Sequence, residues 1–422
     1  MLNIKQLQSE TEALKESLLK RGKNFDDLIT RAILLDEKRK ATQTELESVL
    51  GQSKKMANDI GQLTMENETP ELNSMKVQVL ELKEKSSKLR RALKKIEAKL
   101  FEVLCLIPNA PSLKVPRGKS CNDNLVTLIY GEKLVLKQNL PHWELAAKYN
   151  LIDFELGVKI TGAGFPVYRG KGARLQRALI NFFLDEAREA GYEEIQPPIL
   201  VNEASGFGTG QLPDKEGQMY FAPADNLYCI PTAEVPITNI YRDVILKEDD
   251  FPIKNCGYTP CFRREAGSYG KDVRGLNRLH QFDKVEIVQI AHPAKSYETL
   301  ESMSEYVQGL LQKLGLHYRV LLLCGGDMGF ASAMTYDMEV WSAAQERWLE
   351  VSSVSNFETF QANRLKLRFR NADGKNELAH TLNGSALALP RIVAALLENN
   401  QTPEGIIIPE VLRGYCGFSL ID

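Results

Sequence analysis

The sequence predicts a mixed α+β protein in which an antiparallel β-sheet flanked by helices follows an N-terminal antiparallel pair of long helices. Three observations lead to this prediction. Before residue 106, apolar residues recur at alternating spacings of four and three over two long stretches, as in paired helices. Three prolines then fall within Ile107 to Pro116, where neither a helix nor a central strand tolerates them. Beyond that segment, short apolar runs of strand length alternate with helical stretches such as Ala173 to Glu189.

The N-terminal part is expected to be a helical domain, residues 1–106, with a coiled-coil hairpin at about residues 28–103. One seam of the 4,3 type runs from Leu28 to Ile60, and a second, cleaner one runs from Met75 to Val103. A break from Gly61 to Pro70 is expected to contain a short polar turn. Each seam is narrow and the remaining surface is charged, so the two helices can pack against each other without a larger core.

The first residues, Met1 to Arg21, are expected to form a further helix that ends at Gly22. They alternate Lys and Glu with leucines and lack the apolar core and cleavage site of a secretory signal, so we expect a cytosolic protein. The chain has no uninterrupted apolar run of about 18 residues, which predicts no membrane span.

Composition excludes several classes of protein. With 43% apolar and 26% charged residues, the chain can bury a core, so wholesale disorder is excluded. The seven cysteines are scattered and form no CxxC pair, so reduced thiols are expected rather than a disulfide framework or a zinc site. A net charge of −2 gives no whole-molecule attraction for nucleic acid, and any such partner must be bound by a local patch.

A local patch of this kind lies on the second helix of the hairpin, where lysines and arginines outnumber glutamates. Charge on the outside of a coiled coil is often only a solvated face, and contact with a phosphate backbone is the alternative. The candidate residues for such a nucleic-acid contact are Lys83, Lys88, Arg90, Arg91, Lys94 and Lys95.

The second part, residues 107–422, is expected to carry the chemistry. The expected strands are Glu194 to Val201, Tyr228 to Ile230, Phe282 to Ile290, Tyr318 to Cys324 and Trp348 to Val354. No Walker loop and no GxGxxG motif opens a helix, so ATP would have to bind without those scaffolds.

The most informative stretch is Cys261 to Glu286, which predicts a hairpin: a strand, a glycine-rich loop and a returning strand. Period two places Arg263 and Glu265 on one face; the loop and returning strand supply Gly267, Gly270, Gly275, Phe282, Lys284 and Glu286. An arginine fork suits phosphate and a phenyl ring suits a base. An Arg–Glu pair on a surface hairpin is the simpler alternative.

Several segments of this chain resemble the class II aminoacyl-tRNA synthetases, in their seryl branch. The similarity runs in order over essentially all 422 residues and includes the helical hairpin. The segments that carry it are Gly191 to Pro198 (first motif), Cys229 to Pro236 (serine loop), Phe262 to Gly267 with Arg274 to Leu276 and His280 to Glu286 (second motif), Glu350 to Asn356, and Thr381 to Ser385.

The resemblance implies that serine is activated with ATP and then transferred to tRNA. It places Arg263 on the α-phosphate, Glu265 near the adenine edge and Phe282 against the purine, although Arg264 beside Arg263 offers a second guanidinium. Arg391 would bind the γ-phosphate; independently, His380 to Leu389 predicts a strand that leads into a helix with Pro390 in its first turn. The implied ATP-binding residues are Arg263, Arg264, Glu265, Leu279, Phe282, Glu350, Val351, Ser352, Ser353 and Arg391, with Arg263, Arg391 and Glu265 central to catalysis.

Two further sites are implied. Glu350 and Ser353 would hold Mg²⁺ on the phosphates, because a hard cation takes oxygen ligands. The implied serine-binding residues are Thr232, Ala233, Glu234, Arg263, Glu286, Asn383 and Ser385. Which of Glu234 and Glu286 takes the serine ammonium and which the hydroxyl stays open. Taken alone, Thr232 could equally cap a helix, and Asn383-Gly384-Ser385 could be a turn.

The implied partner is serine tRNA, and selenocysteine tRNA where it is present, held through the long variable arm. The first motif, with Pro197 and Pro198, would build a homodimer in which the arm reaches tRNA on the other subunit. The absence of a Cys/His cluster favours the ordinary bacterial type. Two alternatives stay open: a paralogue that charges a carrier protein, against which the basic hairpin argues, and a coiled-coil RNA-binding protein with a dead catalytic part.

Overall fold

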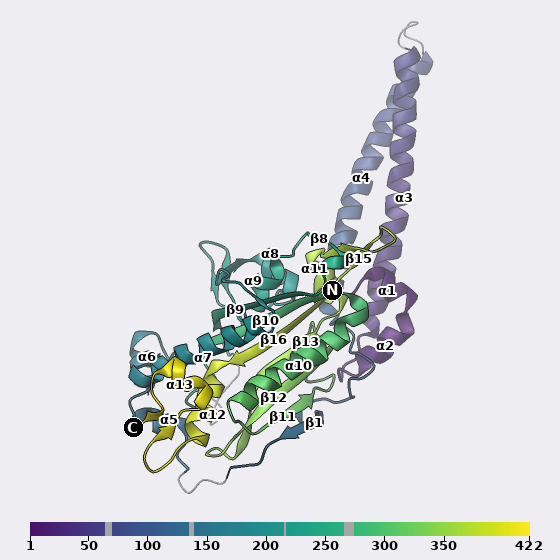
Figure 1. Cartoon of the computed structure of the whole chain (residues 1–422). Coiled ribbons are helices and arrows are strands. Elements are labelled where there is room, and N and C mark those ends of the chain that lie inside the picture. Colours follow the sequence, from purple (N-terminus) through teal and green to yellow (C-terminus); the bar gives the residue numbers. More distant parts are fainter. Residues whose placement is uncertain (64–69, 135–138, 215–216, 266–273) are drawn as a thin grey trace. The chain divides into compact units, whose positions relative to one another are not determined.

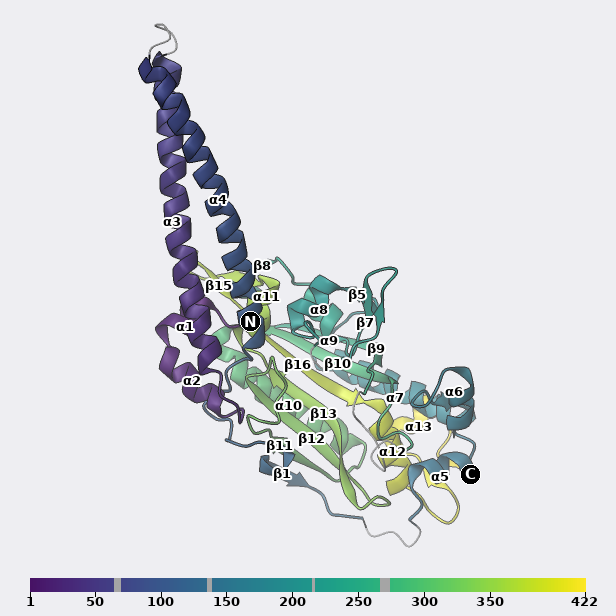
Figure 2. The same ribbon diagram turned by 180° about the vertical axis from the view of Figure 1, so that it is seen from behind.

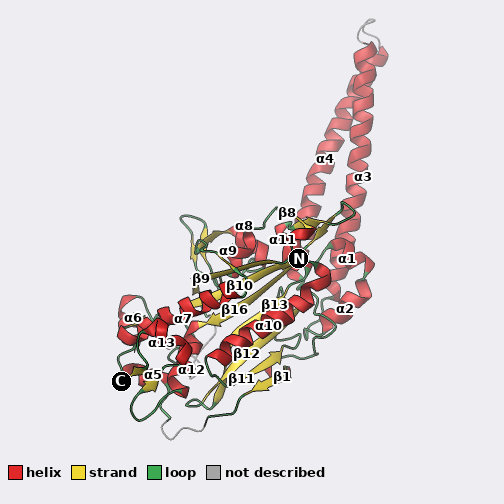
Figure 3. Ribbon diagram, in the orientation of Figure 1, coloured by secondary structure: helices red, strands yellow, loops and turns green. Residues whose placement is uncertain are grey.

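The computed structural model (Figure 1) describes residues 1–63, 70–134, 139–214, 217–265 and 274–422. The chain forms two compact units. The helical unit comprises Leu2–Leu19 and Lys23–Pro108, and the sheet unit comprises Met1, Lys20–Gly22 and Asn109–Asp422. Figure 3 shows that the named strands all belong to the sheet unit.

The helical unit confirms the predicted pair of long helices. Its elements are α1 (Ile4–Ser9), α2 (Thr11–Leu19), α3 (Asp26–Leu63) and α4 (Pro70–Leu106). Helices α3 and α4 pack along their length, and the predicted seam positions are buried or half-buried, for example Ala32 and Val49 on α3 and Val79 and Leu100 on α4. The 4,3 spacing therefore identified the contact face correctly.

Two boundaries in this unit differ from the prediction. The single helix expected over Met1 to Arg21 is divided into α1 and α2 at Glu10. There the Thr11 hydroxyl donates to the carbonyl of Leu7 at 2.6 Å, the kind of local bond by which threonine competes with a regular helix. Helix α3 also continues through Gly61 to Leu63. Residues 64–69, within the expected turn, lie outside the described residues.

The sheet unit contains these helices: α5 (His142–Lys148), α6 (Phe154–Ile160), α7 (Gly170–Glu189), α8 (Glu203–Thr209), α9 (Glu234–Asn239), α10 (Ser296–Lys313), α11 (Thr359–Leu365), α12 (Leu389–Asn399) and α13 (Glu410–Cys416). Its longer strands are β1 (Leu125–Tyr130), β9 (Ile253–Phe262), β10 (Gln281–Ala291), β11 (Tyr318–Leu322), β12 (Met334–Ser342), β13 (Arg347–Asn356) and β16 (His380–Ala388). The short strands are β2 (Ile152–Asp153), β3 (Val167–Tyr168), β4 (Glu193–Glu194), β5 (Leu200–Asn202), β6 (Phe221–Ala222), β7 (Leu227–Cys229), β8 (Ile245–Lys247), β14 (Arg368–Arg370), β15 (Asn376–Leu378), β17 (Ile406–Ile407) and β18 (Leu420–Ile421).

The main sheet confirms the predicted antiparallel architecture. Its eight strands run in the order β1-β11-β12-β13-β16-β10-β9-β4, and all neighbours are antiparallel except β4 and β9. The strand expected from Glu194 to Val201 is wrong: β4 joins the main sheet and β5 joins a separate sheet with β7 and β6. Pro197 and Pro198 explain the division, because proline lacks the N–H that a continuous strand would donate.

The two faces of this sheet have different roles. One face packs on α7, α10 and α12, which lie against it in Figure 1, and it carries buried apolar residues such as Ile287, Met338 and Val354. Figure 2 shows the ribbon from the opposite side. Residues on the other face of the sheet alternate with the apolar ones and include Glu286, Ser353 and Asn383. The candidate site is built on this second, polar face. In the described part of the chain, no helix is long and apolar enough to span a bilayer.

Candidate active site

The register of the sheet brings the predicted phosphate-binding arginines to one end of it. Phe262, the last residue of β9, pairs with Gln281 at the start of β10, and Lys284 pairs with Ala388 at the end of β16. Arg263 directly follows β9, and Arg391 is the third residue of α12, which directly follows β16. Both arginines therefore follow strands that finish at the same end of the sheet.

The two neighbouring arginines lie in different surroundings. The guanidinium carbon of Arg263 lies 5.2 Å from the ring centroid of Phe282, and its Nε donates to the carbonyl of Pro231 at 3.4 Å. Arg264 is exposed, with its guanidinium 5.3 Å from the ring of Tyr220. The structure thus separates two side chains that the sequence left as alternatives, and only Arg263 lies against the predicted base-stacking ring.

The expected alternation of Arg263 and Glu265 along a strand is wrong. Strand β9 ends at Phe262, and Glu265 has a φ of 48°, which is left-handed backbone rather than extended chain. Glu265 instead pairs with Arg278 at 2.8 Å. Gly267 and Gly270 of the expected loop, and the rest of 266–273, lie outside the described residues.

A buried polar cluster occupies the predicted serine site. Lys284 is its centre: its Nζ lies 2.6 Å from Oε2 of Glu286 and donates to the Thr232 hydroxyl at 2.8 Å. The side-chain amide of Asn383 donates to Oε1 of Glu286 at 2.9 Å, and the Ser385 hydroxyl lies 3.5 Å from Oε2. Four of the predicted serine-binding residues, Thr232, Glu286, Asn383 and Ser385, thus belong to this network, together with Lys284, which was not predicted as a site residue.

Glu234 forms the second acidic member of the cluster, at the start of α9. Its Oε1 accepts a hydrogen bond from the Gln361 side chain at 2.6 Å, and the described residues supply none to Oε2. Burial, followed by the nearby charge of Glu286, raises the pKa of Glu234 from 4.5 to about 7, against the opposing effects of Gln361, Lys284 and Arg263. Burial also raises the pKa of Glu286, while Lys284 opposes that rise.

The two simpler alternatives fare differently. Asn383 to Ser385 lies within β16, where it pairs with β10 and β13, so the turn interpretation is wrong. Thr232 does accept a hydrogen bond from the backbone N–H of Glu234 at 3.2 Å, as a capping residue would. The N-cap of α9 is Ala233, which is fully buried.

A β-bulge explains how Glu350 and Ser353 reach the same face. Two residues three apart on a regular strand point to opposite faces. Here Met338 pairs with Ser352 but Glu339 pairs with Glu350, which leaves Val351 as an extra residue on β13. Glu350 therefore shares the polar face with Ser353.

Asp337 adds a third oxygen-bearing side chain at this position, because it pairs directly with Ser353. Its Oδ1 is buried and has no hydrogen-bond partner among the described residues. Burial and the neighbouring charge of Glu350 raise the pKa of Asp337 well above its usual range. Within the ranges that the structure describes, no three or more His, Cys, Asp or Glu side chains are arranged to hold a metal ion on their own.

Arg391 closes this end of the site. Its Nη1 donates to the backbone carbonyl of Glu350 at 2.7 Å and lies 3.7 Å from that residue's Oε2, while Nε donates to the carbonyl of Asn277 at 3.1 Å.

Three other predicted ATP-binding residues have side chains that are engaged within the protein. The side chains of Leu279 and Val351 belong to the main core, and the Ser352 hydroxyl donates to the carbonyl of Ser385 at 2.6 Å, so these residues offer a ligand chiefly their backbone.

Sequence reasoning did not assign three residues of the site. Lys284 alternates with Phe282 and Glu286, which was the available signal for a shared face. Asp337 and Gln361 gave no signal of their own, because each reaches the site only through pairing or packing of a distant segment: Asp337 on β12 and Gln361 on α11.

On the helical unit, the six candidate tRNA-binding residues are all exposed on α4. They fall into two stripes by helical spacing: Lys83, Arg90 and Lys94 on one side, and Lys88, Arg91 and Lys95 on another. Lys88 forms an ion pair with Glu84 at 2.7 Å. Within the described residues, no carboxylate lies within ion-pair distance of the other five.

Comparisons with known proteins agree with this geometry. A family described as the tRNA synthetase class II core domain (G, H, P, S and T) matches residues 221–400, and the seryl-tRNA synthetase N-terminal domain matches residues 1–111. The serine–tRNA ligases of Salinibacter ruber and Akkermansia muciniphila are 51% and 46% identical to this chain, each over 100% of it and 99% of the relative. The crystal structure of seryl-tRNA synthetase from Pyrococcus horikoshii complexed with ATP has a TM-score of 0.93 and 32% identity, covering 100% of this chain and 99% of that one.

The antiparallel sheet and these matches define a class II aminoacyl-tRNA synthetase. Within that class, both the N-terminal domain match and the full-length relatives point to one branch. The chain belongs to the seryl-tRNA synthetase family.

Proposed function

We propose that this protein ligates serine to tRNA, using ATP to form seryl-adenylate with release of pyrophosphate. The observation that carries the proposal is the buried cluster of Thr232, Lys284, Glu286 and Ser385 beside Arg263, because it joins a polar amino-acid site to a phosphate-binding guanidinium. The relative from Pyrococcus horikoshii was crystallised with ATP, which supports the nucleotide part of the proposal.

In the activation step, the serine carboxylate attacks the α-phosphorus of ATP. Arg263 would stabilise the charge that grows on the α-phosphate oxygens, and the purine would stack on Phe282, which already lies against that guanidinium. Pyrophosphate would leave toward Arg391. Catalysis then depends on position and charge rather than on a side-chain nucleophile.

The oxygen atoms of Glu350 and Ser353 fit Mg²⁺, which prefers oxygen ligands and binds through one or two protein groups with phosphates and water. Asp337 lies beside them, and its Oδ1 has no hydrogen-bond partner in the part of the chain that the structure describes. The bound ion would supply positive charge for the phosphate oxygens. We propose Glu350 and Ser353 as its direct ligands.

The cluster also explains how serine would be selected. A site with buried polar groups rejects an analogue that leaves those groups unpaired, as alanine would. The oxygens of Glu286 are already shared among Lys284, Asn383 and Ser385, whereas one oxygen of Glu234 is not used by the described residues. We therefore propose that Glu234 binds the serine ammonium and that the Glu286 side of the cluster binds the hydroxyl.

Serine-dependent ATP/pyrophosphate exchange tests this function directly. We expect exchange with serine, about 10²-fold or more weaker exchange with threonine and alanine, and charging of serine tRNA by the same preparation. Exchange without tRNA charging would instead support a carrier-protein paralogue. A folded protein without exchange would support the RNA-binding alternative and contradict the proposal.

Residues 1–106 are proposed as the tRNA-binding domain and residues 107–422 as the catalytic domain. Replacing Lys83, Arg90 and Lys94 together by alanine is expected to lower kcat/KM for tRNA charging about 10- to 100-fold. The salt dependence of tRNA binding should also become weaker, because each substitution removes a contact with a phosphate group. Exchange without tRNA should not change.

The matched control changes three exposed lysines on α3, Lys38, Lys54 and Lys55, to alanine and so alters net charge equally. An equal loss of charging in both triple variants would mean that the α4 charges are only a solvated face.

A homodimer is also proposed. It is supported by an open cavity of about 580 Å³ at the first motif, lined among others by Gln176, Arg177 and Ile180 of α7 and by Glu194 and Ile195. This cavity lies at the segment that resembles the two-fold interface of the class, so we propose that a second copy of the chain binds there.

A further inference from the structure

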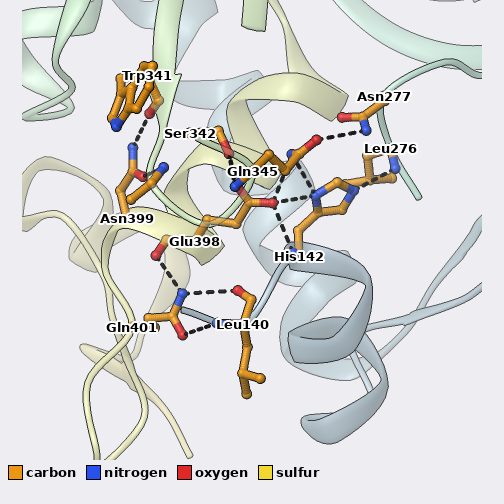
Figure 4. Close-up of polar contacts among 11 residues, drawn as sticks. Leu140, His142, Leu276, Asn277, Trp341, Ser342, Gln345, Glu398, Asn399 and Gln401 are labelled. Atoms are coloured by element: carbon orange, nitrogen blue, oxygen red, sulfur yellow. Dashed lines mark hydrogen bonds and ion pairs between the residues drawn. The ribbon is translucent and has the colours of Figure 1, made fainter. Parts of the chain in front are cut away.

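A buried histidine–glutamate pair lies outside the residues assigned to substrates (Figure 4). Both His142 on α5 and Glu398 on α12 are fully buried, and Nδ1 of His142 lies 2.7 Å from Oε1 of Glu398. The same oxygen accepts hydrogen bonds from the backbone N–H of His142 at 3.0 Å and from the Gln345 side chain at 2.9 Å. The Ser342 hydroxyl donates to the other oxygen. A carboxylate with this many donors holds the imidazole in one orientation.

The hydrogen bonds also fix the tautomer of His142. Its Nε2 lies 2.8 Å from the backbone nitrogen of Leu276, and a backbone N–H can only donate. Nε2 is therefore the acceptor, and the ring proton is on Nδ1, where it is donated to Glu398. The imidazole thus works as a bridge from α12 to the segment that contains Leu276.

That segment, Arg274 to His280, leads directly into β10 and touches the phosphate end of the site. Its Asn277 carbonyl accepts the hydrogen bond from Arg391, and the Asn277 side chain donates to Gln345 at 3.0 Å. Arg391 and Glu398 are seven residues apart on α12 and so lie on the same face, two turns from each other. The segment is consequently held to α12 at two points, by Arg391 directly and by Glu398 through His142.

The packing at Gly275 shows how closely His142 fits this segment. A Cβ at Gly275 would come within 2.3 Å of Nε2 of His142 and 3.1 Å of the Trp143 ring, and the residue has a φ of +67°. Arg274 stacks over the Trp143 ring, 4.7 Å from its centroid. Helix α5 therefore contacts three successive residues, Arg274 to Leu276.

We propose that the His142–Glu398 pair is a positioning device for ATP: it fixes the segment from Arg274 to His280, and thereby the carbonyl that orients Arg391 for the terminal phosphates. This role depends on the proposed function, since it concerns the same nucleotide. His142 and Glu398 are positioning residues and touch no substrate themselves.

Two variants of His142 separate its two hydrogen bonds. In His142→Asn the shorter amide keeps a donor near Glu398 but no longer reaches Leu276, whereas in His142→Gln the side-chain oxygen can take the place of Nε2. Because a buried N–H is left unpaired, we expect His142→Asn to speed hydrogen–deuterium exchange of the peptide with Leu276 about tenfold and to raise the KM for ATP about tenfold in pyrophosphate exchange. The KM for serine should change less than about twofold, and His142→Gln should largely restore both values.

Gln401→Ala is the matched control. Gln401 is buried and hydrogen-bonded to both backbone groups of Leu140, next to α5, and to the backbone carbonyl of Glu398. Within the described residues it makes no hydrogen bond to the segment from Arg274 to His280. It should lower thermal stability without changing the KM for ATP or the deuterium exchange near Leu276.

The proposal is overturned if His142→Asn only loses stability, as the control does, or if folded His142→Gln behaves like His142→Asn. Should His142→Asn not fold, Gly275→Ala displaces the segment while keeping the His142–Glu398 bond and must raise the KM for ATP similarly. If the unaltered protein shows no exchange activity, the proposed function fails, and deuterium exchange still decides whether His142 holds Leu276.

Discussion

Replacing Arg263 by alanine is expected to lower the rate of serine-dependent ATP/pyrophosphate exchange about 10³-fold, while Arg264→Ala lowers it less than about threefold. The two side chains are adjacent in sequence and identical in chemistry, so the pair is internally controlled. Arg263 lies against Phe282 and close enough to Glu234 and Glu286 to influence their pKa values. Arg264 is exposed beside Tyr220.

The chemical requirement at Arg263 can be tested further with lysine. Arg263→Lys keeps the positive charge but loses the planar fork that can hold two phosphate oxygens and stack on a ring. We expect a loss of about 10²-fold in kcat, smaller than for alanine. Comparable losses for Arg263→Ala and Arg264→Ala, with both proteins folded by circular dichroism, would contradict the assignment.

The parts of the fold that were predictable are those in which a local repeat decides the outcome. The 4,3 seams of α3 and α4 required no knowledge of other segments, because each helix buries only one narrow stripe. The division of α1 from α2 was missed because a single hydroxyl, that of Thr11, competes with the helix. The false strand from Glu194 to Val201 shows that an apolar run does not outweigh two consecutive prolines.

Site residues were predictable to the extent that alternation stayed regular. On β10 it does, and Phe282, Lys284 and Glu286 share a face. It fails at Glu265, where the backbone turns left-handed, and at Val351, where a bulge places Glu350 with Ser353. Resemblance to the family pointed to Glu265 and Glu350. The spacing of residues in the sequence shows neither the left-handed backbone at Glu265 nor the pairing with β12 that creates the bulge beside Glu350.

The second large effect is expected at Glu234, whose pKa is about 7. An ammonium group bound beside it favours the ionised carboxylate, so serine binding should release a proton. The KM for serine should therefore rise about tenfold between pH 8 and pH 6, as the ionised fraction falls. Glu234→Gln should raise this KM about 10²-fold and remove its pH dependence, measured by exchange at saturating ATP.

The same buried carboxyl should make the protein without bound serine less stable at high pH. This effect tests the raised pKa of Glu234 independently of serine binding. Between pH 4.5 and about 7 the folded protein keeps a proton on Glu234 that the unfolded chain has released. Unfolding free energy should then fall as pH rises through this window, by on the order of 3 kcal/mol. Because glutamine cannot ionise, Glu234→Gln is expected to raise the Tm at pH 8 while weakening serine binding. If the KM for serine still depends on pH in this variant, the group that titrates is another member of the cluster, such as Glu286. The ammonium would then be bound by that group and not by Glu234.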